Sequence, residues 1–191
     1  KITRHQPALP LYTEENAARA VSLLQTKAFR EPWQVGAFKL QYVPSGHILG
    51  AGNVVVECAE QVIWFSGDIG SYRDILMKEP ESPQHPDYVL MESTYGDRTH
   101  GQSHPEDDLE HIITTTIHRG GIVLVPSFAV GRTQTIMYAV QRLKRAGRIE
   151  DVPVYINSPM ASHVTELYFK HLDDHRMSES ECQTMTDKVH L

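Results

Sequence analysis

Three stretches of the chain place a histidine or a carboxylate among small residues, each beside a predicted strand. His47 lies in the glycine-rich run 44–52, Asp68 follows an apolar run and sits between glycines, and Glu92 directly follows a second apolar run. Imidazole and carboxylate groups bind cations and exchange protons near neutral pH. His47 and Asp68 are therefore candidate metal ligands, and Glu92 is a candidate functional acid.

Each of these residues also has an ordinary structural interpretation. A single loop histidine is usually structural or solvated, and an aspartate in a turn often caps its own backbone. A glutamate after a buried strand is either paired or functional, because an isolated buried charge is costly. The residues alone leave these alternatives open for His47, Asp68 and Glu92.

A fourth stretch suggests an anion-binding turn. The loop 127–133 joins a predicted strand to the start of a predicted helix. Free N–H groups and the helix dipole favour an anion at such a position, and Arg132 can add a bidentate phosphate contact. The alternative is a well-capped turn in which Arg132 forms an internal ion pair.

The first half of the sequence reads as one helix followed by strands. Thr13 can cap a helix whose apolar face includes Ala17, Val21, Leu24 and Ala28, and we expect this helix to lie on a sheet. The last predicted strand lacks polar alternation, which is typical of a strand covered on both faces. The four predicted strands span residues 37–43, 53–58, 62–65 and 88–91.

Helices and strands alternate in the second half. Ser103 and Glu106 can form a capping box, and the helix that follows should end at Gly120. Strands at 122–125 and 152–156 flank a helix that closes at Gly147, a βαβ pattern that predicts parallel pairing. A further helix starts near Ser158, and the sequence turns polar beyond Leu172.

Composition indicates a soluble globular protein. The 191 residues are 40% hydrophobic, and no apolar run approaches the ~18 to 20 residues that span a bilayer. The N-terminal residues do not lead into a signal-type segment, and the two cysteines imply no disulfide framework, which favours a reducing cytoplasm. A net charge of -6 argues mildly against nucleic acid, although bound divalent cations would offset acidic site residues.

Taken in order, five runs of sequence resemble the β-CASP nucleases of the metallo-β-lactamase superfamily, especially the RNA-processing group. The runs are SGHILGAG, FSGDIG, LMESTYGDR, GGIVLVPSFAVGRTQ and VYINSPMA, within a resemblance that extends over residues 10–168. It implies an α/β fold: part of a metallo-β-lactamase αββα sandwich in residues 1–98, followed by part of a Rossmann-like βαβ β-CASP domain in residues 99–191.

The resemblance also implies roles for single residues. His47 corresponds to a ligand of one zinc, and Asp68 to a catalytic carboxylate that bridges two zincs. Glu92 corresponds to a catalytic acid that orients a histidine from later in the chain. Ser158, with Ser127 and Arg132, would bind substrate along the channel. Such a site performs two-metal phosphodiester hydrolysis.

Two departures from the family pattern stand out. The His-x-His-x-Asp-His motif and the later family histidines are absent from this sequence. The run from His171 to His175 is superficially similar to that motif but lacks the second histidine spacing, and His100 and His104 are expected in a solvated loop. We therefore expect this chain to look like a central fragment that by itself binds zinc weakly and lacks nuclease activity.

The leading functional hypothesis is RNA cleavage by the parent protein, as an endonuclease, a 5' exonuclease or both. The alternatives are a DNA-processing nuclease of the same group and a non-catalytic scaffold subunit of an RNA-processing complex. RNA is the expected partner, with a homodimer or processing-complex subunits as further partners and no membrane association.

Overall fold

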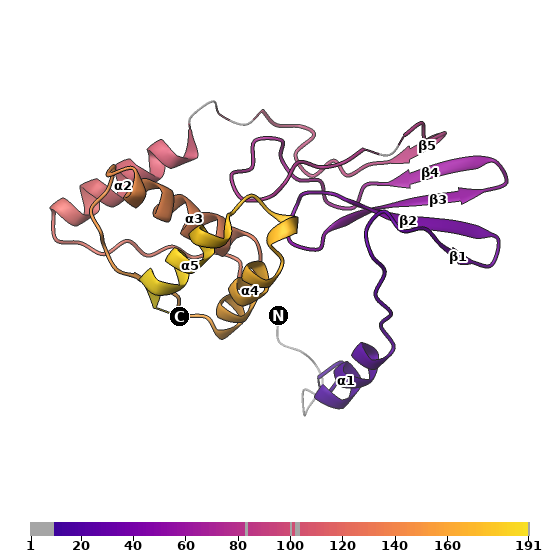
Figure 1. Cartoon of the computed structure of the whole chain (residues 1–191), viewed down its shortest axis with the longest axis horizontal. Coiled ribbons are helices and arrows are strands. Elements are labelled where there is room, and N and C mark those ends of the chain that lie inside the picture. The colour runs from indigo at the N-terminus through magenta and orange to yellow at the C-terminus, as the bar shows by residue number, and fades with distance from the viewer. Residues whose placement is uncertain (1–9, 83, 100, 102–103, 191) are drawn as a thin grey trace, which may run out of the picture.

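The computed structural model describes residues 10–82, 84–99, 101 and 104–190, and the fold begins with a five-stranded mixed sheet. Neighbouring strands pair in sequence order, antiparallel except for the last pair, which is parallel (Figure 1). The strands are β1 (Trp33–Val35), β2 (Phe38–Pro44), β3 (Gly52–Cys58), β4 (Gln61–Phe65) and β5 (Tyr88–Leu90). Four of them confirm the predicted strands to within about a residue; β1 was not predicted.

Tight turns set the register of the antiparallel strands. Ala59 and Glu60 form the two-residue turn between β3 and β4, next to the Cys58–Gln61 pair. Both have positive φ, 50° and 63°. Two consecutive left-handed residues produce the turn twist that matches the right-handed twist of paired strands. The connection from β4 to the parallel strand β5 must cross over, and it is this long crossover, residues 66–87, that carries Asp68.

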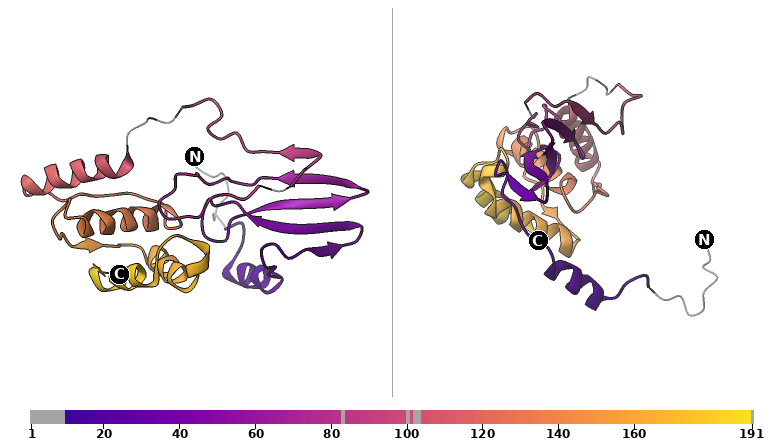
Figure 2. Two further views of the ribbon diagram at one scale, coloured as in Figure 1. Left: turned by 45° about the horizontal axis from the view of Figure 1, so that its top comes forward. Right: turned by 90° about the vertical axis from the view of Figure 1, so that its right-hand side faces the viewer.

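The first helix forms as predicted but does not cover a sheet. Helix α1 (Glu14–Ser22) starts with a capping box between Thr13 and Asn16, and none of its residues is buried. It lies apart from the sheet in both figures (Figures 1 and 2). The prediction that it packs on a sheet is wrong, because the helix ends before Leu24 and Ala28, so the expected apolar face is only half formed.

Residues 104–190, hereafter the helical part, pack helices around two small cores. Its elements are α2 (Pro105–His118), α3 (Arg132–Arg145), β6 (Val154–Tyr155), α4 (Pro159–Lys170), the 3-10 turn η1 (Leu172–Asp174), α5 (Glu179–Lys188) and β7 (Val189–His190). The ends predicted at Gly120 and Gly147 are confirmed by their left-handed φ of 74° and 67°. The predicted Ser103 cap lies outside the described residues, and His104 stands at the N-cap without a side-chain bond.

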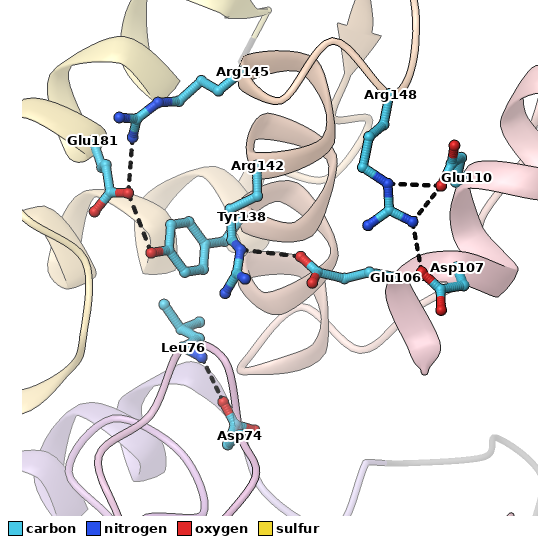
Figure 3. Close-up of polar contacts among 10 residues, drawn as sticks. All are labelled: Asp74, Leu76, Glu106, Asp107, Glu110, Tyr138, Arg142, Arg145, Arg148 and Glu181. Carbon is cyan, nitrogen blue, oxygen red and sulfur yellow. Dashed lines mark hydrogen bonds and ion pairs between the residues drawn. The ribbon is translucent and has the colours of Figure 1, made fainter. Parts of the chain in front are cut away.

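Ion pairs join α3 to the helices on either side (Figure 3). Toward α2, Arg142 lies 3.0 Å from Glu106, and Arg148 bonds to both Asp107 and Glu110. Toward α5, Arg145 lies 2.9 Å from Glu181. Arg142 and Arg145 of α3, and Arg148 just beyond its end, therefore have acidic partners within the fold. The polar sequence beyond Leu172 forms helix α5, on which Cys182 is nevertheless buried.

The strand predicted at 122–125 does not form. Ile122 and Leu124 are 92% and 89% exposed, and no ladder bond joins this run to another described strand. In place of the predicted βαβ pairing, the short strand β6 pairs in parallel with β7. Residues 88–90 do pair with β4, but they are about half exposed instead of covered on both faces. An apolar run becomes a buried strand only when neighbouring strands and a covering layer are present.

One core combines residues of the β4–β5 crossover with residues of the helical part. Leu76 and Met77, in the β4–β5 crossover, are 0% and 4% exposed and pack with Met137, Tyr168 and Met177 of the helical part. Asp74 accepts the N–H groups of both crossover residues at 2.7 Å, which shapes this segment into a compact turn. The β4–β5 crossover, which also carries Asp68, is thus anchored in the helical part. The predicted division at residue 98 stays a prediction, and this core spans it.

No helix in the described part of the chain combines the length and apolar character that a bilayer crossing needs.

Candidate active site

His47 and Asp68 meet at one edge of the sheet. His47 lies in the turn between β2 and β3, and Asp68 lies three residues beyond β4. The His47 Nε2 atom is 4.0 Å from Asp68 Oδ2, and both side chains are accessible, at 45% and 72%. Two polar groups that are 21 positions apart in sequence therefore present their heteroatoms to the same small region of solvent.

Backbone contacts lock the two turns together. The Gly70 N–H donates to the Ser45 carbonyl at 2.8 Å, and a Cβ added to Gly70 would lie only 2.0 Å from the Gly46 carbonyl oxygen. Gly46 itself has φ of 68°, a conformation that side chains other than glycine rarely adopt. Glycine at both positions is thus what allows the His47 and Asp68 turns to approach closely.

Glu92 is held beside this pair by three hydrogen bonds. Its carboxylate accepts the Ile69 N–H at 2.7 Å and the Thr94 hydroxyl at 2.6 Å. Its own N–H donates to the Oγ of Ser66, a side chain that is 1% exposed, at 3.0 Å. The pKa of Glu92 lies below its ordinary value, chiefly because the Ile69 N–H and then the Thr94 hydroxyl donate to its carboxylate. Burial opposes this lowering, and the electrostatic interaction with His47 contributes less than burial does. Glu92 is therefore both paired and close to His47.

The His47–Asp68 geometry is compatible with a shared zinc ion. Zinc binds nitrogen and oxygen at about 2.0–2.2 Å, so two ligands of one tetrahedral ion lie roughly 3.4 Å apart. Closing the observed 4.0 Å needs only a small side-chain movement. Among the described residues, however, no group of three or more His, Cys, Asp or Glu side chains is placed to hold a metal ion. The described residues therefore offer two candidate ligands and not a complete site.

The loop 127–133 is capped by its own atoms. The Arg132 and Thr133 N–H groups donate to the Val130 and Phe128 carbonyls at 3.1 and 3.2 Å, and the hydroxyls of Ser127 and Thr133 lie 2.7 Å apart. Two helix N–H groups that could have bound an anion are thus already used. The side chain of Arg132 is exposed and has no acidic partner in the described residues, so the internal ion pair that we weighed for it does not form there.

Ser158 also has a structural role in this fold. It is the N-cap of α4, where its Oγ accepts the Ala161 N–H at 3.2 Å. The buried side chain of Gln134, which the sequence did not single out, links the 127–133 loop to α4 through bonds to the Ala129 carbonyl and to Thr165 Oγ1. The two predicted substrate-binding segments are thereby joined.

The histidine-rich run near the C-terminus is not a ligand cluster. His175 is 2% exposed, and its ring nitrogens lie 2.8 Å from the Tyr168 carbonyl and 3.2 Å from the Met177 N–H. His171 is exposed, 3.7 Å from Asp174. The two histidines lie on either side of a 3-10 turn and do not share a helical face. His104 is exposed, in line with the predicted solvated loop, and His100 lies outside the described residues.

The turn that carries His47 also contacts the helical part. A Cβ on Gly131 would lie 2.6 Å from Ile48 Cγ2, and the Leu49 N–H donates to the Tyr168 hydroxyl at 3.3 Å. Sequence reasoning identified neither Tyr168 nor Thr94 and Ser66. Thr94 lies two residues from a candidate acid, which is a usable signal, but Tyr168 is 119 positions from its partner.

His47, Asp68 and Glu92 thus lie on loops at one edge of a mixed sheet, and the turn that carries His47 is contacted by the helical part. The family model described as "Beta-Casp domain" matches residues 133–191. The chain is 34% identical over 161 residues to ribonuclease TTHA0252 of Thermus thermophilus, which covers 83% of this chain and 37% of that protein. It is 30% identical over 168 residues to the RNase J-like protein of Methanocaldococcus jannaschii, which covers 85% of this chain and 39% of that protein.

A eukaryotic relative is similar over the same region. Cleavage and polyadenylation specificity factor subunit 3-I of Arabidopsis thaliana is 29% identical over 161 residues, 83% of this chain and 23% of that protein. The matched domain and these relatives support assignment of the chain to the β-CASP group of RNA-processing nucleases. It spans less than two fifths of the length of these relatives.

Proposed function

We propose that the complete protein is a zinc-dependent hydrolase of phosphodiester bonds in RNA, acting as an endonuclease, a 5' exonuclease or both. The observation that carries the proposal is the convergence of His47, Asp68 and Glu92 at one sheet edge, with Nε2 of His47 and Oδ2 of Asp68 4.0 Å apart. The relatives named as ribonucleases support RNA as the substrate.

Each residue of the cluster has a defined task in this proposal. His47 and Asp68 would hold zinc, which when bound would activate water and stabilise negative charge on the scissile phosphate. Glu92 stays ionised at neutral pH, because its lowered pKa is maintained by the Ile69 and Thr94 hydrogen bonds. In the complete protein this anionic carboxylate would orient a histidine from later in the chain, as the resemblance implies.

The helical part would contribute contacts to the RNA backbone. Arg132 is the best placed of the predicted substrate-binding residues, since its guanidinium is exposed and unpaired in the described structure. Ser127 and Ser158 would border the same path, each with a hydroxyl at a helix N-terminus. The self-capped backbone of the 127–133 loop makes side chains, and not backbone N–H groups, the expected phosphate ligands.

The 191-residue chain by itself should bind zinc weakly and cleave no RNA. A zinc site needs about four ligands, and the described residues offer two. The remaining ligands would come from other segments of the complete protein.

The test compares zinc content and RNA cleavage for Asp68→Asn and for Asp97→Asn in the complete protein. Asp97 is an exposed aspartate, 78% accessible, paired only with its neighbour Arg98 in the described structure, so it controls for loss of one surface carboxylate. We expect Asp68→Asn to lower both zinc content and cleavage by at least tenfold and Asp97→Asn to change neither. An unmodified protein that binds zinc but cuts only DNA would replace RNA with DNA as the substrate. One that binds no zinc would leave a scaffold role.

A further inference from the structure

The turn that presents His47 is supported from two sides. Toward the sheet, its backbone is closed by the Ala51 N–H bond to Ile48 and the Ser45 N–H bond to Ala51, both 3.0 Å. Toward the helical part, the Leu49 N–H has the Tyr168 hydroxyl as its partner. Leu49 lies two residues from His47, so the second contact holds the same turn that carries the candidate ligand.

Tyr168 is a rigid support for this contact. Its side chain is 0% exposed, and its ring stacks on the ring of His175 with centroids 5.6 Å apart. The Tyr168 carbonyl is also bound, 2.8 Å from Nε2 of the same histidine. Burial raises the pKa of the Tyr168 phenol, so the hydroxyl is neutral over the physiological pH range. A hydroxyl on a ring so tightly enclosed cannot follow the turn if the turn moves.

The same core contains a tyrosine with no such contact. Tyr138 is 6% exposed and belongs to the same cluster, but its hydroxyl lies 3.3 Å from Glu181, on α5. Packing alone therefore does not account for where the Tyr168 hydroxyl is directed. A phenylalanine would fill the volume of Tyr168 but would leave the Leu49 N–H without its partner.

We propose that Tyr168 is a positioning residue, which holds the His47 turn in place through the Leu49 N–H and so couples the helical part to the proposed zinc site. The inference rests on the proposed RNA hydrolase function. It adds a connection between the predicted substrate-binding residue Ser158 and the proposed zinc site, because one helix, α4, has Ser158 as its N-cap and carries Tyr168 near its other end. Ser158 is a predicted substrate-binding residue, so a shift of α4 on RNA binding would reach the His47 turn directly.

The experiment compares Tyr168→Phe with the matched control Tyr138→Phe in the complete protein. Each change removes one hydroxyl from the same core. The measurements are the thermal midpoint, hydrogen exchange of the Leu49 amide, zinc affinity, and kcat and KM for RNA. We expect Tyr168→Phe to accelerate Leu49 exchange and to lower kcat by about tenfold each, with KM for RNA unchanged, and Tyr138→Phe to leave kcat and Leu49 exchange unchanged.

Three results would overturn the inference. If Tyr168→Phe does not change the exchange rate of the Leu49 amide, the hydrogen bond on which the inference depends is contradicted. Faster exchange with unchanged kcat and zinc affinity would reduce Tyr168 to a packing residue. Equal losses of kcat in both variants would indicate a general effect of weakening the core. If the unmodified protein does not cleave RNA, the proposed function fails, and exchange and zinc affinity still decide whether Tyr168 supports the turn.

A second pair of variants applies if Tyr168→Phe does not fold. Gly131→Ala places a methyl group 2.6 Å from Ile48 Cγ2, whereas Gly147→Ala meets no atom within 4 Å. Both glycines have positive φ, 79° and 67°, so an alanine at either position also strains the backbone. A selective loss of zinc affinity and kcat in Gly131→Ala would support coupling through the turn, and matched behaviour of the two variants would contradict it.

Discussion

The His47–Asp68–Glu92 cluster and the 127–133 loop were both predicted to follow strands, but the fold supports them differently. The cluster is carried by loops at the ends of β2, β4 and β5, which are paired in one sheet. The loop follows residues 122–125, which pair with no other described strand. Strand register therefore positions the cluster, while the loop depends on its own caps and on the contact of Gly131 with Ile48. A site can be organised locally without the sheet that usually precedes it.

The largest expected effect comes from weakening the core that joins the Asp68 crossover to the helical part. Leu76→Ala in the complete protein should lower the free energy of unfolding by about 3 kcal/mol, because Leu76 is fully buried in the core that anchors the Asp68 crossover to the helical part. Chemical denaturation measures the change. Leu24→Ala, at a residue that is 75% exposed, is the control and should change stability by less than about 0.5 kcal/mol. Similar values for the two variants would contradict a shared core.

A second change attacks the interlocked turns of the cluster. Gly70→Ala should cost about 2 kcal/mol and reduce zinc binding, since its Cβ would lie 2.0 Å from a backbone oxygen that cannot rotate away. Gly36→Ala is the control, because Gly36 has φ of 59° and open space around its Cα, so only the left-handed backbone is penalised. Denaturation and zinc titration are the measurements. If Gly70→Ala keeps normal zinc binding, close approach of the turns is not what positions the cluster.

The loop is probed by Arg132→Ala. Arg132 is exposed and forms no ion pair in the described structure, so its loss should change stability by less than about 0.5 kcal/mol. RNA affinity should fall by about fivefold, and the slope of log affinity against log salt should decrease by roughly 1 if one phosphate contact is lost. Binding titrations at several salt concentrations provide both numbers. A salt slope identical to that of the unmodified protein would exclude Arg132 from the phosphate path.

The smallest effect concerns the charge of Glu92. Its pKa is lowered in the folded protein, so its ionised form adds stability that is fully present above the ordinary glutamate value of about 4.3 and is lost as the pH falls through the lowered value. Glu92→Gln should therefore cost about 1 kcal/mol or less at pH 7, and this cost should shrink steadily below pH of about 4. Denaturation over a pH series measures it, with the exposed Glu31→Gln as control. A cost that does not vary with pH would mean that the carboxylate charge contributes nothing.

The sequence by itself determined the features that depend on near neighbours. Thr13 and Ser158 act as helix caps as their types predict, because a cap bonds to an N–H only three residues away. The sequence likewise predicted helix α3 and the glycines that end α2 and α3. Resemblance in the ordered runs identified His47, Asp68 and Glu92 as belonging together, and the described geometry gathers them.

Only the tertiary structure decided which apolar segments are buried and what holds the cluster. Residues 122–125 are apolar and α1 carries part of an apolar face, yet both remain exposed, since burial requires partners that no local pattern encodes. Conversely, Leu76 is buried among helices that begin more than 50 positions later in the chain, and Tyr168 contacts the His47 turn across 119 positions. Contacts between such distant residues depend on the path of the whole chain.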